Sequence, residues 1–306
     1  MRLLVGVCIA AFAVSCVQDD SVDDIGETSQ EVRVCADAAT IPGIDVSKWQ
    51  GEIDWDAVAA SGVKYAVIRV SHGLNVFDEW FEYNWTEAKR VGIIRSVYQY
   101  FSPGQDATAQ ARLLLDNMGP LEPGDLPPVI DVEQSDGESQ ATITAKIHEW
   151  IDEVETAIGM KPIIYTAKYF WQDGVGAPAD FLDYPLWVAN YGVECPLIAD
   201  PWQRWTIWQH SSTGSVPGIS GNVDLNHFNG SMDDLLALTK AEPEPDPDPD
   251  PDPDPDPDPD PDPDPDPDPD PITDPATGGC STGSGSGPGY ALLLAFGLLA
   301  VRRRRR

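Results

Sequence analysis

A strict alternation of one acidic residue with one proline over residues 242–271 restricts the folding of this chain more than any other feature. The run holds 15 acidic residues and 15 prolines and offers no large apolar side chain to a core. Proline removes backbone donors and restricts φ, and the repeated like charges repel one another. We expect an extended, polyproline-like spacer that rises about 3.1 Å per residue, with at most weak cation binding by its carboxylates.

Much of the negative charge of the chain lies in this run, but the region before it is also acidic. The 306 residues carry a formal net charge of −32, whereas Cys35 to residue 241 has 12 Lys/Arg against 29 Asp/Glu, a balance of −17. An acidic surface of this kind argues against binding to a nucleic-acid backbone, which needs clusters of Lys and Arg. About 200 residues of mixed, tryptophan-rich sequence are enough for one well-packed domain.

The N-terminus is typical of an exported protein. Met1-Arg2 precedes a short apolar run, so residues 1–15 are predicted to be a secretory signal peptide. The exit Ala13-Val14-Ser15-Cys16 resembles a bacterial lipoprotein box in which Cys16 would be lipidated, although Ala13 stands where Leu is usual. Ordinary cleavage near the same place is the alternative. Residues 16–40 are predicted to be a polar spacer before the domain.

The C-terminus suggests a second processing signal. After the linker 242–277, residues 278–306 combine Gly278-Gly279-Cys280, a short apolar stretch and five terminal arginines. The apolar stretch is too short to span a bilayer easily. The layout resembles the Gly-Cys sorting tag of myxobacterial surface proteins, which is cut near its cysteine; a short permanent anchor is the alternative. We therefore expect an exported protein that is secreted or held at the cell surface or outer membrane through its processed termini.

The five cysteines separate by position. Cys8 lies in the signal peptide, and Cys16 and Cys280 lie at the two candidate processing sites. Cys35 and Cys195 remain, and an exported chain is in a compartment that permits disulfides. A Cys35–Cys195 bridge is the natural pairing, provided that the fold brings the two side chains within reach. No Cys/His spacing is typical of zinc, so no metal is expected.

The region between the spacers alternates strand-like and helix-like patterns. The strand-like segments are rich in Val, Ile, Tyr and Trp: Gly43–Ser47, Tyr65–Ser71, Ile93–Phe101, Pro127–Glu133, Pro162–Lys168, Leu186–Tyr191, Trp205–Ser211 and Val223–Phe228. Helix-like patterns occupy the first four connections: Trp55–Ser61, Glu79–Val91, Asp106–Met118 and Gln140–Ile158. The last two connections, 192–204 and 212–222, are too short for a crossover helix. An α/β class with an incomplete TIM-like barrel over residues 41–241 is predicted; a doubly wound sheet is the alternative, without a Gly-rich fingerprint to support it.

Four acids mark the predicted catalytic end of the barrel. Asp131 and Glu133 close the fourth strand and share one face, because side chains at i and i+2 of a strand point the same way. Asp45 lies near the end of the first strand and Asp224 near the start of the last. Neighbouring carboxyl groups raise one another's pKa, so one can stay protonated beside a carboxylate, as glycoside hydrolysis requires.

Several motifs then resemble one family over roughly residues 42–230. They are Gly43-Ile44-Asp45-Val46-Ser47, Gln50-Gly51, Ile53-Asp54-Trp55, Phe81, Asn84-Trp85, Pro128-Val129-Ile130-Asp131-Val132-Glu133, Ile164-Tyr165-Thr166, Trp187-Val188-Ala189-Asn190-Tyr191, Trp208-Gln209 and Val223-Asp224-Leu225-Asn226. Together they resemble the family 25 glycoside hydrolases, the lysozymes that cut bacterial peptidoglycan. The resemblance implies an N-acetylmuramidase with a (β/α)5(β)3 barrel that acts as a monomer and needs no cofactor.

The resemblance also implies roles for individual residues. Glu133 would be the general acid, Asp131 would orient the N-acetyl group of the substrate as an internal nucleophile, and Asp45 and Asp224 would complete an acidic floor. Five further side chains would shape the sugar cleft: Tyr98, Tyr165, Trp187, Tyr191 and Gln209. The chain departs from the family at Ser71-His72-Gly73, where Thr-Glu-Gly is frequent, so an acid near the cleft is lost.

Two other functions remain open from the sequence. A chitinase-like N-acetylglucosaminidase also uses a strand-end Asp-x-Glu, but the additional aspartates that precede it there are absent from Pro127-Pro128-Val129-Ile130. A surface-displayed wall-binding module without turnover would not need Glu133.

Overall fold

The computed structural model describes residues 33–242, which belong to one compact unit. The predicted signal peptide, the possible lipidation site Cys16, nearly all of the Asp-Pro linker and the C-terminal signal with Cys280 lie outside the described residues. Within residues 33–242, no helix combines the length and the apolar character needed to cross a membrane.

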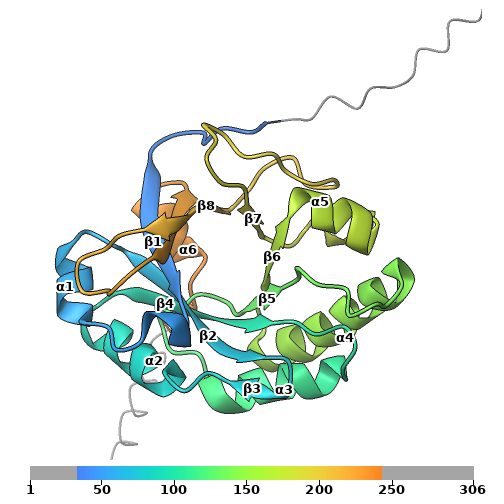
Figure 1. Ribbon diagram of the computed structural model, residues 1–306, viewed down its shortest axis with the longest axis horizontal. Helices are drawn as coiled ribbons and strands as arrows, with labels where there is room; N and C mark the ends of the chain where they lie inside the picture. The colour runs from blue at the N-terminus through green and yellow to red at the C-terminus, as the bar shows by residue number, and fades with distance from the viewer. Residues whose placement is uncertain (1–32, 243–306) are drawn as a thin grey trace, which may run out of the picture. The chain divides into compact units, whose positions relative to one another are not determined.

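Eight strands close into a barrel, as the sequence predicts (Figure 1). In chain order they are β1 (Thr40–Val46), β2 (Tyr65–His72), β4 (Ile94–Tyr100), β5 (Val129–Asp131), β6 (Ile163–Ala167), β7 (Leu186–Ala189), β8 (Ile207–Gly214) and β9 (Val223–Asn229). The sheet order is β1-β9-β8-β7-β6-β5-β4-β2, and pairing of β1 with β2 closes the ring. A two-residue strand that the sequence did not indicate, β3 (Val76–Phe77), pairs with β2 outside the ring.

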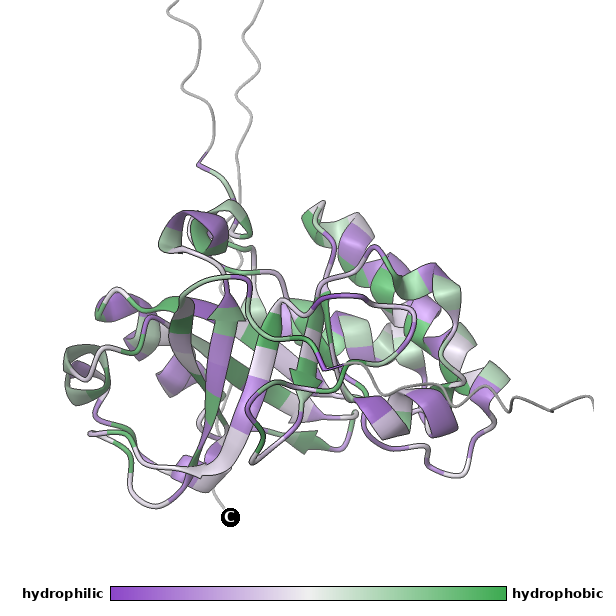
Figure 2. Ribbon diagram, turned by 90° about the horizontal axis from the view of Figure 1, so that it is seen from above, coloured by the Kyte–Doolittle hydropathy of each residue, from purple (hydrophilic) through white to green (hydrophobic). Residues whose placement is uncertain are grey.

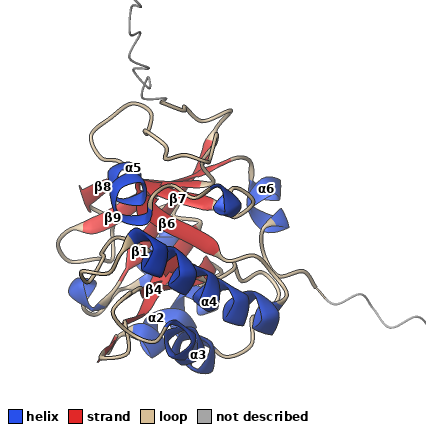
Figure 3. Ribbon diagram, turned by 90° about the vertical axis from the view of Figure 1, so that its right-hand side faces the viewer, coloured by secondary structure: helices blue, strands red, loops and turns tan. Residues whose placement is uncertain are grey.

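Five of the connections are helical and pack outside the strands. These are α1 (Trp55–Ala60), α2 (Phe81–Arg90), α3 (Ala107–Met118), α4 (Gln140–Ile158) and, after β6, the short turns α5 (Lys168–Phe170), η2 (Trp171–Val175) and η3 (Ala179–Phe181). Side chains of Asp54, Asp106 and Ser139 accept from backbone amides and so begin α1, α3 and α4. The remaining strands are joined by loops, and α6 (Met232–Ala237) follows β9. The predicted (β/α)5(β)3 barrel is confirmed (Figure 3).

The strands divide the core into two layers because alternate side chains point to opposite faces. Tyr65 and Val67 of β2 belong to the cluster inside the barrel, whereas Ala66 and Ile68 pack in the larger cluster that includes helix residues. Gly43 is required on β1, because a Cβ there would lie 2.2 Å from Cζ of the Tyr65 ring. In Figure 2 the helices carry apolar and hydrophilic stripes side by side, as expected where one helix face packs on strands and the other meets water.

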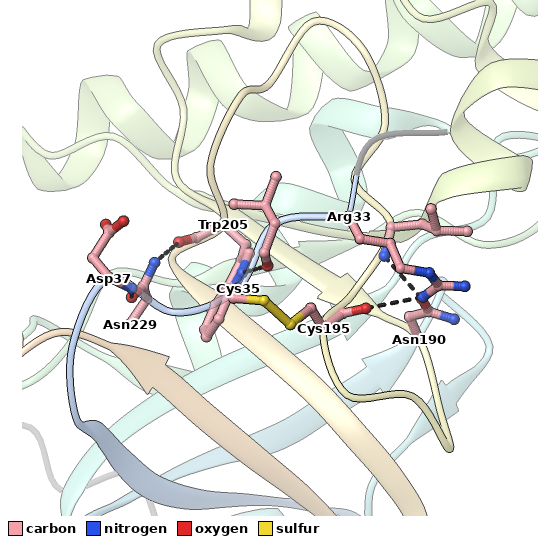
Figure 4. Close-up of a disulfide and its surroundings, with 9 residues drawn as sticks. Arg33, Cys35, Asp37, Asn190, Cys195, Trp205 and Asn229 are labelled. Carbon is pink, nitrogen blue, oxygen red and sulfur yellow. Dashed lines mark hydrogen bonds between the residues drawn. A yellow bond between two sulfur atoms is a disulfide. The ribbon is translucent and has the colours of Figure 1, made fainter. Parts of the chain in front are cut away.

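The segment before β1 is attached to the side of the barrel that lacks a crossover helix (Figure 4). Cys35 and Cys195 form a disulfide between residues 160 positions apart in the sequence. This is the pairing that the sequence analysis predicted. Val34 donates its amide to Pro196 O at 3.0 Å and accepts from Trp205 Nε1 at 2.7 Å. Residues 33–40 therefore belong to the domain, and the predicted spacer 16–40 extends too far at this end.

Candidate active site

A cavity of about 280 Å³ opens at the carboxyl ends of the parallel strands. All nine side chains singled out in the sequence as catalytic or substrate-binding line it: Asp45, Tyr98, Asp131, Glu133, Tyr165, Trp187, Tyr191, Gln209 and Asp224. Five further residues, to which the sequence analysis gave no role in the site, complete the lining: Ser47, Trp49, Gln50, Arg69 and Tyr100. Their positions fit the rule that barrel enzymes place chemistry at this face.

Asp131 and Glu133 occupy the end of β5 and share the cavity but not the same environment. Asp131 is the last residue of the strand and is 5 % exposed, whereas Glu133 lies beyond the strand and is exposed to the cavity. Burial raises the pKa of Asp131 well above its usual range, and the charges of Glu133 and Asp45 raise it further. Partial loss of hydration raises the pKa of Glu133, opposed by a hydrogen bond from Tyr100 and reinforced by the charge of Asp224. The two carboxyl groups therefore hold protons more readily than free acids do.

Asp45 on β1 is fixed by hydrogen bonds from the two neighbouring strands β9 and β8. Its Oδ2 accepts from Gln209 Nε2 at 2.8 Å and from Asn226 Nδ2 at 2.7 Å. Tyr165 and Tyr191 both donate to Gln209 Oε1, at 2.8 and 2.6 Å. The hydrogen bonds from Gln209 and Asn226 favour the ionised form of Asp45. Burial and the charge of Asp224 outweigh them and raise the pKa of Asp45 to about 8. Asp45 is thus held in place while it competes for a proton at neutral pH.

Asp224 reaches the same cavity because β9 runs against its neighbours. β9 is antiparallel to both β8 and β1, so its first residues lie at the end where the parallel strands finish. Asp224 pairs with Asp45 in this register. Burial raises the pKa of Asp224 to about 6. The acidic floor expected from the sequence therefore forms, although its last member comes from the start of a strand.

Aromatic rings form the wall of the cavity and extend into the barrel. Trp187 makes edge contacts with Tyr165 and Tyr98, at centroid distances of 4.7 and 6.5 Å. Its Nε1 donates to Asn226 Oδ1 at 2.8 Å, so the ring cannot rotate freely. Trp187 and Tyr165 are buried, whereas Tyr191 is 45 % exposed at the rim. These rings therefore serve both as core and as lining.

Arg69 is the functional residue that the sequence reasoning missed most clearly. It is a charged residue inside the apolar strand β2, and its Nε donates to the buried Asp78 Oδ2 at 2.9 Å. The same carboxylate oxygen accepts from the backbone amide of Lys48 at 2.8 Å, in the turn that carries Trp49. Trp49 is 77 % exposed and lines the cavity. A lone arginine in an otherwise apolar strand was the available signal.

The sequence analysis also missed Tyr100, although the alternation of side chains along the strand would have indicated it. It lies two residues after Tyr98 on β4 and therefore belongs to the same face. Within residues 33–242 no group of three His, Cys, Asp or Glu side chains is arranged to hold a metal ion.

The mouth of this barrel brings carboxyl groups of unequal acidity together with aromatic walls, the combination that hydrolysis of a glycosidic bond requires. The fold and the site together define a glycoside hydrolase.

Comparison with known proteins narrows the class to a family. The model described as "Glycosyl hydrolases family 25" matches residues 44–219. Lysozyme M1 of Streptomyces globisporus is 36% identical over 213 residues, which cover 66% of this chain and 72% of that protein. The uncharacterized protein YegX of Escherichia coli K12 is 39% identical over 203 residues, covering 65% of this chain and 73% of YegX. The crystal structure of the bacterial lysozyme from Streptomyces coelicolor superimposes with a TM-score of 0.63 at 36% identity, covering 66% and 98% of the two chains. The chain belongs to glycosyl hydrolases family 25.

Proposed function

We propose that this enzyme is an N-acetylmuramidase that hydrolyses the β-1,4 bond between N-acetylmuramic acid and N-acetylglucosamine in peptidoglycan. The observation that carries the proposal is that Asp131 and Glu133, one buried and one exposed, share an aromatic-walled cavity with two further acids. The similarity to the two Streptomyces lysozymes supports the same substrate class.

Glu133 is the general acid in this proposal. Its carboxyl proton passes to the glycosidic oxygen as the bond from that oxygen to the anomeric carbon breaks. The acetamido oxygen of the substrate attacks the anomeric carbon and forms a cyclic oxazolinium intermediate, a substrate-assisted route. The Glu133 carboxylate then removes a proton from water, which attacks the anomeric carbon and opens the ring. The exposed position of Glu133 beyond β5 suits a group that must reach both the leaving oxygen and water.

Asp131 accepts the acetamido N–H of the substrate and so points the acetamido oxygen at the anomeric carbon. The free site disfavours ionisation of Asp131, because it is buried and its Oδ1 has no hydrogen-bond partner in the described structure. A hydrogen bond from the substrate N–H, together with the nearby Arg69 charge, favours the carboxylate. Substrate binding would thereby leave the proton on Glu133. Asp45 and Asp224 keep the site acidic and raise the pKa values of their neighbours.

The reducing-end sugar of the products tests the proposal directly. Purified peptidoglycan digested by the enzyme and then reduced with borohydride is expected to give muropeptides that end in muramitol, because a muramidase frees C1 of N-acetylmuramic acid. Mass spectrometry identifies the reduced sugar. Products that end in reduced N-acetylglucosamine would instead establish a glucosaminidase, and an undigested wall that retains the protein would indicate a binding module.

The acidity of Glu133 should depend on Asp224. The charge of Asp224 raises the pKa of Glu133, and the pKa of about 6 for Asp224 leaves it mostly ionised at neutral pH. Activity needs protonated Glu133, so it falls as pH rises through the pKa of that group. Asp224→Asn removes the charge, lowers the pKa of Glu133 and is expected to move the alkaline limb of the kcat/KM profile to lower pH. A limb that stays in place or moves to higher pH would contradict this assignment.

We further propose that the enzyme is exported and works as a monomer outside the cytoplasm. The support comes from the sequence: a signal-like N-terminus that ends near Cys16, and the sorting-type tail around Cys280. Lipidation at Cys16 or processing near Cys280 would hold it at the surface. The Asp-Pro linker of residues 242–277 would then set its distance from that attachment.

A further inference from the structure

His72, the residue at which this chain departs from the expected Thr-Glu-Gly pattern, lies at the end of β2 beside the cavity but not in its lining. A change of register in β2 explains its position. Arg69 pairs with Tyr98 of β4, yet His72 pairs with Tyr100, so three residues of β2 oppose two of β4. A bulge of this kind turns the following side chains to the other face, and bulges beside active sites often redirect a side chain in this way. His72 is thereby placed against Tyr100.

The imidazole of His72 packs on the ring of Tyr100. The two ring centroids are 4.2 Å apart and the planes make an angle of 39°. Tyr100 and Glu133 line the same cavity, where the Tyr100 hydroxyl lowers the pKa of the Glu133 carboxyl group by interacting with it. Glu133 lies beyond the last ladder pairing of β5, so strand hydrogen bonds do not fix its position. The orientation of the Tyr100 ring therefore bears directly on where the Glu133 carboxyl group sits.

A second contact reaches the chain next to Glu133. Gln134 Nε2 lies 3.4 Å from His72 Nε2, and it also donates to Ser102 Oγ at 3.0 Å and to Phe101 O at 3.4 Å. The contact with a carbonyl oxygen identifies this atom as the amide nitrogen, which can only donate. The contact with His72 Nε2 is a hydrogen bond only in the neutral imidazole whose Nε2 carries no proton.

The charged groups around His72 agree with the neutral form. Burial lowers the pKa of His72, and the charge of Arg69 on the same strand lowers it further. Asp136, in the loop after β5, acts in the opposite direction. A cation at this position would stabilise the Glu133 carboxylate and so oppose its role as an acid. A neutral ring avoids that cost and still supports Tyr100.

We propose that His72 is a positioning residue for the reaction: its neutral ring holds Tyr100 in the orientation in which the tyrosine hydroxyl meets Glu133. The inference rests on the proposed function, in which Glu133 is the general acid. His72 itself touches neither the substrate nor the reacting atoms.

A double-mutant cycle tests this role. His72→Ala is expected to lower kcat about tenfold, because a misplaced catalytic group costs rate, while KM changes little. The hydrogen bond from Tyr100 lowers the pKa of Glu133, so its loss should move the alkaline limb to higher pH in both His72→Ala and Tyr100→Phe. The double variant should match Tyr100→Phe, and His72→Phe, which keeps a ring on Tyr100, should retain most of the wild-type rate and pH profile.

His148→Ala is the matched control. His148 lies on α4 and stacks on Phe181 at a centroid distance of 4.4 Å, outside the cavity lining. The His148→Ala variant should keep the wild-type pH profile. A wild-type rate and profile in His72→Ala, or additive effects of His72→Ala and Tyr100→Phe, would overturn the inference. If Glu133→Gln is inactive in the same assays, Glu133 keeps its role as the general acid and only the positioning role of His72 fails; an active Glu133→Gln would instead remove Glu133 from the mechanism.

Discussion

Glu133→Gln is expected to lower the release of reducing ends from purified peptidoglycan by about 10²–10⁴-fold, the usual contribution of a general acid. Glutamine has nearly the same shape as glutamic acid but no carboxyl proton to give to the leaving oxygen. Glutamine is neutral, as the protonated acid is, and it keeps a carbonyl oxygen that accepts hydrogen bonds, so the groups that hold the sugar chain stay in place. Binding of the variant to insoluble peptidoglycan, measured by co-sedimentation, should therefore persist.

The matched control is Glu138→Gln, the same chemical change five residues further along the loop after β5. Glu138 does not line the cavity, so this variant should release reducing ends at the wild-type rate. Turnover by Glu133→Gln that equals turnover by Glu138→Gln would remove Glu133 from the mechanism. Loss of both turnover and binding in Glu133→Gln would point to damage beyond the loss of a proton donor.

Asp78→Ala is expected to lower the free energy of unfolding by about 3–5 kcal/mol, because it leaves a buried charge without its partner. The side chains of Arg69 and Asp78 are 10% and 1% exposed, and Arg69 Nη2 lies 2.8 Å from Asp78 Oδ2. The substitution also removes the acceptor of the Lys48 amide, which fixes the turn that carries Trp49. Chemical denaturation followed by intrinsic tryptophan fluorescence measures the change.

An exposed pair in the same domain provides the comparison. Asp56 and Arg90 approach to 2.6 Å, but their side chains are 72% and 47% exposed. Because water and salt screen such pairs, Asp56→Ala should shift the denaturation midpoint far less than Asp78→Ala. Replacing both buried partners, as Arg69→Met with Asp78→Leu, should recover part of the loss, since no buried charge then remains unpaired. Equal midpoints for Asp56→Ala and Asp78→Ala would show that the buried pair does not stabilise the fold.

The pairing of Arg69 with Asp78 illustrates where sequence reasoning stops. Arg69 was visible as a charge inside an apolar strand, but no local pattern names its partner. Asp78 precedes α2 in a connection that reads as an ordinary loop. Similarly, Gln209 was assigned to the cleft by resemblance, whereas its hydrogen bond to Asp45 joins residues 164 positions apart. Such partners are chosen by how the strands and their connections pack in three dimensions.

The sequence by itself determined the elements and the direction in which their side chains point. Short runs rich in Val, Ile, Tyr and Trp marked the eight strands, and helix-like patterns marked the first four helices, because such preferences act within a short segment. Strand geometry set Asp131 and Glu133 on one face at the end of β5. The sequence alone also predicts an extended spacer for the alternating acid–proline run, because proline restricts φ and neighbouring like charges repel within a few residues.

Only the tertiary structure decided the register, the closure and the direction of the last strand. The antiparallel course of β9 brings Asp224 opposite Asp45, and a bulge in β2 brings His72 against Tyr100. The bridge between Cys35 and Cys195 likewise depended on how the barrel closes. These features follow from contacts between residues far apart in the chain, whose free energies depend on the packing of the whole barrel and are not encoded in any short segment.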